Sequence, residues 1–424
     1  MTDPTSSPVP APRHRRLLVA LLVAGTALNY VDRQVLALLK PTLVATFGWD
    51  DRAFAHLGSA FQLTTAAALL LAGWLVDRFG VRRAYGAAVA TWSLAGIAHA
   101  VAATIAQFVG ARVALAAAES LNTPAAVKAA ARHLPLAERS LGLGLINMAP
   151  NLGAIVTPLV VPALAVAFGW RAAFVVTGAL GFAWLLAWWP ATRWMDALPT
   201  APGVDGGAAP PATWGAVLGD RRTWAIAGAK GLSDMVWWFL LFWTPDLFAR
   251  AFGLGQGALG APIALVYTLA ALGALSGGAL FPWWLARGAT VDRARKGAML
   301  GYGALVLPVP LALATGNPWL AAALIGIALF AHQGFSTTLF GLTADLVPEA
   351  RVARVIAVGA VTGNLAGMGM IELTGWTLAT GVGYAPLFAL SAVAYLLATG
   401  WIQLLVPVIR VPGAPGGDSA AAGI

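Results

Sequence analysis

Long apolar runs recur along the whole chain, and short polar segments that contain arginine separate them. A helix needs about 20 apolar residues to cross the hydrocarbon core of a bilayer. Twelve runs reach this length, and they cover residues 17–46, 53–76, 83–105, 107–131, 140–167, 171–190, 222–249, 258–285, 296–315, 318–346, 352–380 and 384–408. The pattern therefore predicts an all-α membrane protein with twelve membrane-spanning helices.

Composition and charge refine this prediction. Of the 424 residues, 59% are hydrophobic and 10% are charged, whereas about 25% of the residues of a soluble domain are charged. The formal net charge of +9 raises the question of nucleic acid binding, so the positions of the 26 Lys and Arg residues matter. Eighteen of them fall in the loops on the side of the N-terminus, three in the opposite loops and five within the helices. Because cytoplasmic loops carry the basic excess, we expect a multi-pass protein of the inner (plasma) membrane with both termini in the cytoplasm, and no nucleic acid partner.

A polar segment rich in proline and glycine divides the chain into two sets of six predicted helices. The predicted organisation is a cytoplasmic tail at 1–16, a six-helix bundle at 17–190, a cytoplasmic inter-domain linker at 191–220, a second six-helix bundle at 221–409 and a cytoplasmic tail at 410–424. Weak self-similarity relates the bundles, since Pro41 and Gly73 recur 204 residues later as Pro245 and Gly277. Such duplicated halves, which are expected to be pseudo-symmetric, are typical of transporters that work by alternating access.

Several other classes of function are not indicated. The chain has no cysteine, so disulfides and thiolate chemistry are excluded. Its five histidines are scattered, and no metal cluster, nucleophile elbow or phosphate loop is found. We therefore expect that the protein is not an enzyme, that it binds no metal, and that it uses no cofactor other than the proton as a coupling ion.

The loop between the second and third predicted helices carries a specific motif. Residues 73–83 read G-W-L-V-D-R-F-G-V-R-R, which resembles the G-x-L-x-D-R-x-G-x-R-R loop of the major facilitator superfamily. Its first glycine permits close helix packing, its second a tight turn, and its aspartate can lie against the positive end of another helix. The resemblance implies a role in conformational gating for Gly73, Asp77, Arg78, Gly80, Arg82 and Arg83. A basic inner loop that only follows the topology rule is the simpler alternative.

Four charged residues fall inside two predicted helices. Asp32 and Arg33 lie in the first helix, and Arg112 and Glu119 in the fourth. A charge at the centre of a bilayer costs roughly 2.5–3.5 kcal/mol on insertion scales, so each one is a candidate for function. Arg112 and Glu119 are nearly two helical turns apart, which places them on one face at about 10 Å. Protonating either acid can free an arginine to bind an anion, although static ion pairs that lock the two helices are an alternative.

These charges support a second resemblance. N-Y-x-D-R in the first helix and R-x6-E followed by a proline in the fourth resemble the anion:cation symporter branch of the same superfamily, which includes hexuronate and galactonate carriers. The resemblance implies that Arg33 binds the substrate carboxylate and that Asp32 and Glu119 carry protons. It also implies that Arg112 tunes Glu119.

Other segments resemble the sugar-acid carriers of this branch. They are P-A-A-V-K, which ends at Lys128, F-A-H-Q, which ends at Gln333, and the seventh helix with Lys230 four residues before Asp234. The resemblance implies substrate contacts for both lysines and for Gln333. Lys230 and Asp234 can instead pair with each other, since they are one turn apart.

Further polar side chains suit a polyhydroxylated anion, which needs many donors and acceptors. The remaining candidates for substrate contact are Asn29, Asn147, Asn151, His332, Ser336 and Asn364. Amides also hold membrane helices together, and a serine often bonds back to its own helix. His332 can equally be a packing residue.

Two departures from the resemblance limit it. An extra acid, Glu372, follows the segment where relatives carry a threonine-proline pair, and it is either a third titrating group or a side chain that reaches toward the outer surface. Organophosphate antiporters use a second arginine where this chain has Trp237, which argues against a phosphate ester.

The sequence predicts a monomeric, proton-coupled symporter that imports a hexuronate or another sugar acid. Its expected partners are a small organic anion, protons and the lipid bilayer. The alternatives are a symporter of a monocarboxylate or an aromatic acid, a proton-driven exporter, and a nutrient sensor that binds its ligand without transporting it.

Overall fold

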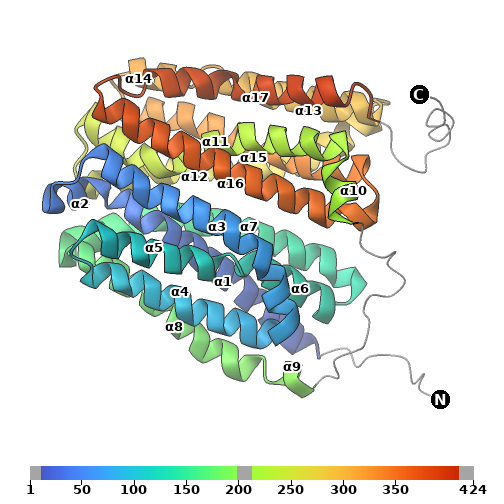
Figure 1. Cartoon of the computed structure of the whole chain (residues 1–424), viewed down its shortest axis with the longest axis horizontal. Helices are drawn as coiled ribbons and strands as arrows, with labels where there is room; N and C mark the ends of the chain where they lie inside the picture. Colours follow the sequence, from blue (N-terminus) through green and yellow to red (C-terminus); the bar gives the residue numbers. More distant parts are fainter. Residues whose placement is uncertain (1–10, 198–212, 410–424) are drawn as a thin grey trace. The chain divides into compact units, whose positions relative to one another are not determined.

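The computed structural model describes residues 11–197 and 213–409, and all regular structure in these ranges is helical (Figure 1). The helices are α1 (Pro12–Leu38), α2 (Lys40–Phe47), α3 (Asp51–Phe79), α4 (Val81–Val101), α5 (Ile105–Glu119), α6 (Asn122–His133), α7 (Leu136–Phe168), α8 (Trp170–Ala191), α9 (Trp194–Ala197), α10 (Trp214–Leu218), α11 (Arg221–Phe252), the 3-10 helix η1 (Gln256–Ala258), α12 (Gly260–Ala286), α13 (Val291–Val306), α14 (Leu311–Ala314), α15 (Pro318–Leu346), α16 (Glu349–Ala379) and α17 (Ala385–Leu405). Residues 1–10 of the predicted N-terminal tail, residues 198–212 of the predicted linker and the predicted C-terminal tail at 410–424 lie outside the described residues.

Ten helices of the described ranges are long and apolar enough to cross a membrane. The two predicted spans that do not qualify, 17–46 and 107–131, fall on α1–α2 and α5–α6, the segments with the buried charges. α5 has only 15 residues, and the polar residues from Asn29 to Gln34 lower the mean hydropathy of α1. The all-helical fold is confirmed, whereas the count of twelve spans stays a prediction.

Proline explains why both of these segments are interrupted. Pro41 and Pro124 have no backbone N–H, so neither can bond to the carbonyl four residues earlier and continue the helix. The first break falls at Leu39, between α1 and α2. The second break separates α5 from α6, so Glu119 is the last residue of α5.

The chain forms two compact units. Unit 1 consists of Met1–Trp49, Ala67–Gly207 and Leu254–Ala264, and unit 2 of Asp50–Ala66, Ala208–Gly253 and Leu265–Ile424. The first half of α3 thus belongs to unit 2 and its second half to unit 1, while α12 is divided in the opposite sense. Each unit therefore includes a short segment from the other half of the sequence.

Close helix contacts hold unit 1 together. α1 packs against α7, where a Cβ atom added at Gly153 would overlap the carbonyl oxygen of Ala27. α4 packs against α8 through Tyr85, Trp184 and Trp188, whose rings lie 4.8–5.3 Å apart between centroids. These contacts fix α1 and α4 around the buried charges.

A row of glycines on α16 faces α11 in unit 2. Lys230 lies against Gly359, Asp234 against Gly363, and Trp238 against Gly367. Both rows repeat every four residues, so they run along facing stripes of the two helices. An added Cβ would overlap Asp234 and Trp238 at the second and third glycines. The absence of a Cβ therefore brings the polar stripe of α11 close to α16.

Candidate functional site

The charged cluster of unit 1 joins α1 and α5. Arg33 donates a hydrogen bond from Nε to Glu119 Oε2 at 2.8 Å, and this ion pair has side chains that are 13% and 0% exposed, respectively. Among the described residues, the other carboxylate oxygen, Oε1, has no hydrogen-bond partner. Arg33 also lies over the ring of Tyr30, with 5.2 Å from its guanidinium carbon to the ring centroid. The pair is buried on the Glu119 side and only slightly accessible on the Arg33 side.

Asp32 and Arg112 complete the predicted group of four. Both are buried, at 4% and 2% exposed, and Arg112 interacts electrostatically with Asp32, Arg33 and Glu119. Asp32 lies close to α4, since its Oδ1 is 3.9 Å from a Cβ built on Gly96 of that helix. Successive helix residues are about 100° apart around the axis, which allows Asp32 to approach α4 while Arg33 pairs with Glu119 of α5.

Neutral polar residues that the sequence did not single out lie near this cluster in unit 1. Tyr85 donates to Asn122 Oδ1 at 2.6 Å, and Thr26 donates to the same oxygen at 3.3 Å. These bonds tie α1 and α4 to the first turn of α6. Asn29 is buried as well, and in the described part of the chain its Nδ2 has no hydrogen-bond partner.

The remaining candidates of unit 1 differ in their surroundings. Lys128 pairs with Asp77 of the loop motif, and both side chains are partly exposed, at 35% and 69%. Asn151 is buried on α7, whereas Asn147, one turn earlier, is exposed. The two amides of α7 therefore lie in different environments.

The loop motif is only partly explained by the structure. Gly80 separates α3 from α4 with φ +75°, a conformation that favours glycine. Arg82 bonds to Trp189 O at 2.9 Å and lies over the Trp189 ring. A Cβ added at Gly73 would meet no heavy atom of the described residues within 4 Å. The close packing expected of Gly73 is therefore not seen among the described residues.

A second ion pair of unit 1 lies near the start of α7. Arg15 donates to both carboxylate oxygens of Glu138, at 2.9 and 2.7 Å. The hydrogen bond from Arg15 lowers the pKa of Glu138, and the positive charges of Arg15 and Arg16 add to this effect. The pair is a surface contact between α1 and α7.

The cluster of unit 2 centres on one turn of α11. Lys230 Nζ lies 2.8 Å from Asp234 Oδ1 and 3.4 Å from Ser336 Oγ of α15. The two charged side chains are 16% and 12% exposed. Lys230 borders a cavity with an empty volume of about 230 Å³, and the lining residues are Ile226, Lys230, Ser336, Leu339, Phe340, Thr343, Ile356 and Gly359. The cavity is thus mostly apolar, with one ammonium group on its wall.

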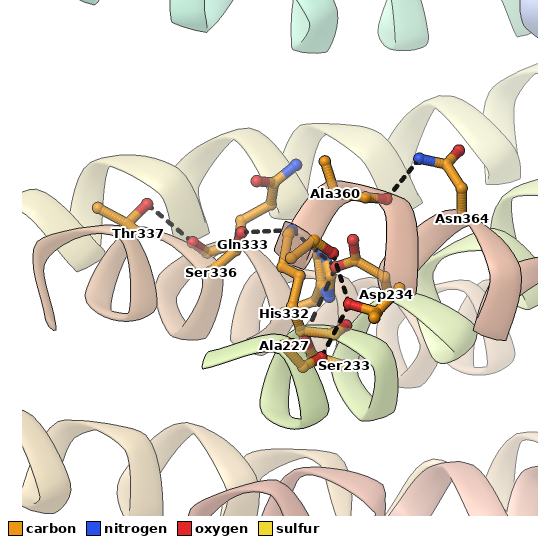
Figure 2. Close-up of polar contacts among 12 residues, drawn as sticks. Ala227, Ser233, Asp234, His332, Gln333, Ser336, Thr337, Ala360 and Asn364 are labelled. Atoms are coloured by element: carbon orange, nitrogen blue, oxygen red, sulfur yellow. Dashed lines mark hydrogen bonds and ion pairs between the residues drawn. The ribbon is translucent and has the colours of Figure 1, made fainter. Parts of the chain in front are cut away.

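Figure 2 shows the other candidates of unit 2 together with Asp234. His332 is buried, with Nδ1 2.8 Å from the Tyr395 hydroxyl and its ring stacked on Trp237. Gln333 is half-buried. Asn364 donates from Nδ2 to Ala360 O of its own helix at 2.8 Å. These contacts give His332 a packing role, in addition to any contact with a ligand.

A charged network near the first turn of α3 was not found from the sequence. Arg250 pairs with Asp51 at 2.5 Å and with Asp246 at 2.8 Å, and Tyr384 donates to Asp246 at 2.5 Å. The i, i+4 spacing of Asp246 and Arg250 is the feature of the sequence that could have indicated part of this network. All these residues belong to unit 2.

Glu372 lies beside His56, with 2.8 Å between Oε1 and Nδ1. The side chains are 36% and 62% exposed, for Glu372 and His56 respectively. Glu372 is therefore a partly exposed partner of α3 and not a member of the buried cluster.

Most of the chain matches a known protein family. Residues 22–371 match the Major Facilitator Superfamily. The chain is 28% identical to the hexuronate transporter of Escherichia coli strain K12, over 90% of this chain and 92% of that protein. It is 27% identical to the probable L-galactonate transporter of the same strain, over 79% of this chain and 77% of that protein.

A solved structure shares the fold. A bacterial homologue of the human lysosomal transporter Spinster superposes with a TM-score of 0.76 at 18% identity, covering 93% of this chain and 97% of that one. The ten apolar helices make this chain a multi-pass membrane protein. By the extent of the family match, the chain is a transporter, not an enzyme, and belongs to the Major Facilitator Superfamily.

Proposed function

We propose that this protein is a proton-coupled symporter that imports a hexuronate or a closely related sugar acid by alternating access. The observation that carries the proposal is the ion pair of Arg33 and Glu119, which joins α1 and α5 and leaves one carboxylate oxygen without a hydrogen-bond partner among the described residues. The similarity to a hexuronate transporter and a probable L-galactonate transporter supports the class of substrate.

The chemistry of the pair suggests the order of events. While Glu119 is ionised, it occupies the guanidinium of Arg33. Protonation of Glu119 removes the charge that holds the arginine, and a substrate carboxylate can then take its place with two parallel hydrogen bonds. Asp32 and Arg112 lie within electrostatic reach and keep the buried group close to neutral. Protons and the anion therefore enter together.

We further propose twelve spans in the inner membrane, with α1–α2 and α5–α6 as the two interrupted ones and with both termini in the cytoplasm. The chain has no cysteine, so a single cysteine introduced at either end can report its side of the membrane. It is expected to react with an impermeant maleimide only after the cells are permeabilised. Reaction in intact cells would contradict this topology.

Proton movement in proteoliposomes tests the function directly. Addition of glucuronate outside liposomes that contain a pH-sensitive dye should acidify the lumen, and empty liposomes should give no signal. Hexanoate, lactate and benzoate serve as competitors, because a carrier of small or aromatic acids would prefer them to glucuronate. Binding of glucuronate without any proton or substrate movement would instead favour a sensor, and glucuronate exit driven by inward protons would favour an exporter.

A further inference from the structure

The end of α12 presents an exposed arginine on an exposed tryptophan. The guanidinium carbon of Arg287 lies 3.7 Å from the centroid of the Trp283 ring, and Arg287 Nη1 donates to the Trp283 carbonyl oxygen at 3.4 Å. Both side chains are exposed, with Trp283 at 49%. A guanidinium can stack on an aromatic face and still present its planar fork of N–H groups to a phosphate. The proposed function does not use this pair.

The exposed stripe of α12 that leads to this pair is apolar. Its residues follow one another at intervals of three or four and so lie on one face of the helix; they are Leu272, Leu275, Ala279 and Trp283. The segment Gln256–Ala286 is long and apolar enough to cross a membrane. Such a face lies against lipid chains, and an arginine at its end can extend into the headgroup region. The surface therefore combines an apolar stripe with a cation at one end.

A second exposed arginine lies at the start of the next helix. The chain turns at Gly288, which has φ +81°, and Arg293 is in the first turn of α13. Trp284 of α12 packs on Gly297 of α13, where its ring is 3.3 Å from an added Cβ. The last turn of α12 and the first turn of α13 thus lie side by side, and Arg287 and Arg293 are at the same end of this helix pair. The whole surface belongs to unit 2.

Two acids near this turn are already paired. Asp292 lies 2.8 Å from Lys296, and Asp345 of α15 lies 2.8 Å from Arg295. In the described part of the chain, the two exposed arginines of the turn form no ion pair. A zwitterionic headgroup brings a cation that needs a carboxylate, whereas an anionic headgroup brings only a phosphate to the arginines. The charges therefore complement an anionic phospholipid better than a zwitterionic one.

We propose that Arg287, Trp283 and Arg293 form a binding site for an anionic phospholipid such as phosphatidylglycerol. The guanidinium of Arg287 binds the phosphate with two parallel hydrogen bonds, and Arg293 adds positive potential at the same end. The indole of Trp283 lies at the level of the headgroup, and the acyl chains lie along the apolar stripe of α12. The site lies within one unit and does not depend on which substrate is transported.

Local fluorescence quenching tests the site. The chain has no cysteine, so a fluorophore on Ala279→Cys reports only this stripe of α12. The labelled full-length chain is placed in phosphatidylcholine vesicles with increasing amounts of phosphatidylglycerol or phosphatidylcholine that carries a spin label on an acyl chain. In the parent, half-maximal quenching should need a smaller mole fraction of phosphatidylglycerol than of phosphatidylcholine. Arg287→Gln should raise the phosphatidylglycerol value about fivefold, the effect of one basic residue near an anionic headgroup, and change the phosphatidylcholine value less than about twofold.

Arg13→Gln is the matched control, because it removes the same charge from an exposed arginine of α1 in unit 1. It should change neither value, and equal shifts in Arg13→Gln and Arg287→Gln would show an effect of net charge alone. Equal quenching by the two lipids in the parent would also overturn the proposal. Soluble glycerophosphoglycerol should not relieve the quenching; if it does, the site binds a free phosphate ester and not a lipid. Arg287→Gln should melt in detergent at the parental temperature, since Arg287 is exposed, and a variant that does not fold contradicts the proposed role.

Discussion

The two units each hold a buried acid paired with a base, but the two pairs are built differently. In unit 1, Arg33 of α1 pairs with Glu119 of α5, so the two charges come from separate helices. In unit 2, Lys230 pairs with Asp234 one turn later on the same helix, α11. A change in the distance between α1 and α5 breaks the first pair, whereas the second pair moves as one body with its helix.

The pair of unit 1 can therefore act as a switch, whereas the pair of unit 2 is a fixed element of one helix. A buried charge left without its partner is strongly disfavoured, so opening the pair of unit 1 requires a proton on Glu119 or an anion on Arg33. The pair of unit 2 needs neither, because its partners stay together in any rigid movement of α11. We infer that coupling resides in unit 1, and that Asp234 holds the ammonium group of Lys230 in a fixed position beside the cavity.

Removal of Arg33 should have the largest effect on binding. Arg33→Ala leaves the substrate carboxylate without its guanidinium, and loss of one partner of a buried charged hydrogen bond costs about 2–5 kcal/mol. Titration calorimetry should therefore show glucuronate affinity lowered at least about 30-fold. Arg33→Lys keeps the charge but not the planar fork, and it should fall between the parent and Arg33→Ala. Parent-like affinity in Arg33→Ala would show that another basic residue binds the substrate carboxylate.

Breaking the pair of unit 2 tests whether it is static. Lys230→Met alone should leave Asp234 as an unpaired buried charge and destabilise the protein by about 3 kcal/mol. The double variant Lys230→Met with Asp234→Leu removes both charges and should recover most of that loss, as measured by chemical unfolding. In unit 1 the matching double variant, Arg33→Met with Glu119→Leu, should fold but not transport. Recovered stability together with lost glucuronate transport in the Lys230 double variant would show that unit 2 also takes part in binding.

The glycine row supports the position of the unit 2 pair. Gly363→Ala places a Cβ where it overlaps Asp234, and overpacking of this kind typically costs about 1–3 kcal/mol. The melting temperature should fall by several degrees. Gly369→Ala is the matched control on the same helix, because a Cβ there meets no heavy atom of the described residues within 4 Å. It should be neutral or slightly stabilising, since alanine favours a helix. Equal melting temperatures for the two variants would show that the glycine row of α16 has no steric role.

The surface pair of Arg15 and Glu138 should give the smallest effect. Its hydrogen bond lowers the pKa of Glu138 in the folded state, so it stabilises the protein above the ordinary glutamate pKa of about 4.3 and loses this effect as the pH falls through the lowered value. Glu138→Gln should therefore lower the melting temperature slightly at pH 7 and not at all near pH 3. A larger difference at the acidic pH would contradict this sign.

The sequence predicted the class of fold and the charged cluster because both depend on strong local signals. Apolar runs and loop arginines indicate a helical membrane protein without knowledge of packing. The seven-residue spacing of Arg112 and Glu119 indicated one face of one helix, and their position near Asp32 and Arg33 followed from the resemblance. What the charges contact depended on which residue of α1 faces α5, and only the fold gives that.

Long-range neighbours explain what the sequence did not predict. The pairing of Arg250 with Asp51 was not predicted, because the two residues are 199 positions apart in the chain. Lys128 was assigned to substrate but pairs with Asp77, 51 residues earlier in the chain. Pro41 and Pro124 are visible in the sequence, but only the helix bounds show that they interrupt two predicted spans, neither of which is among the ten helices that are long and apolar enough to cross a membrane.

The most direct test of coupling in unit 1 is a comparison of two transport modes in Glu119→Gln. Proteoliposomes are loaded with unlabelled glucuronate to measure counterflow, and in parallel an inward pH gradient is imposed to measure accumulation. Glutamine mimics the protonated acid and leaves Arg33 available, so we expect counterflow near the parental rate and no accumulation driven by pH. Accumulation equal to that of the parent would show that Glu119 does not carry the coupled proton.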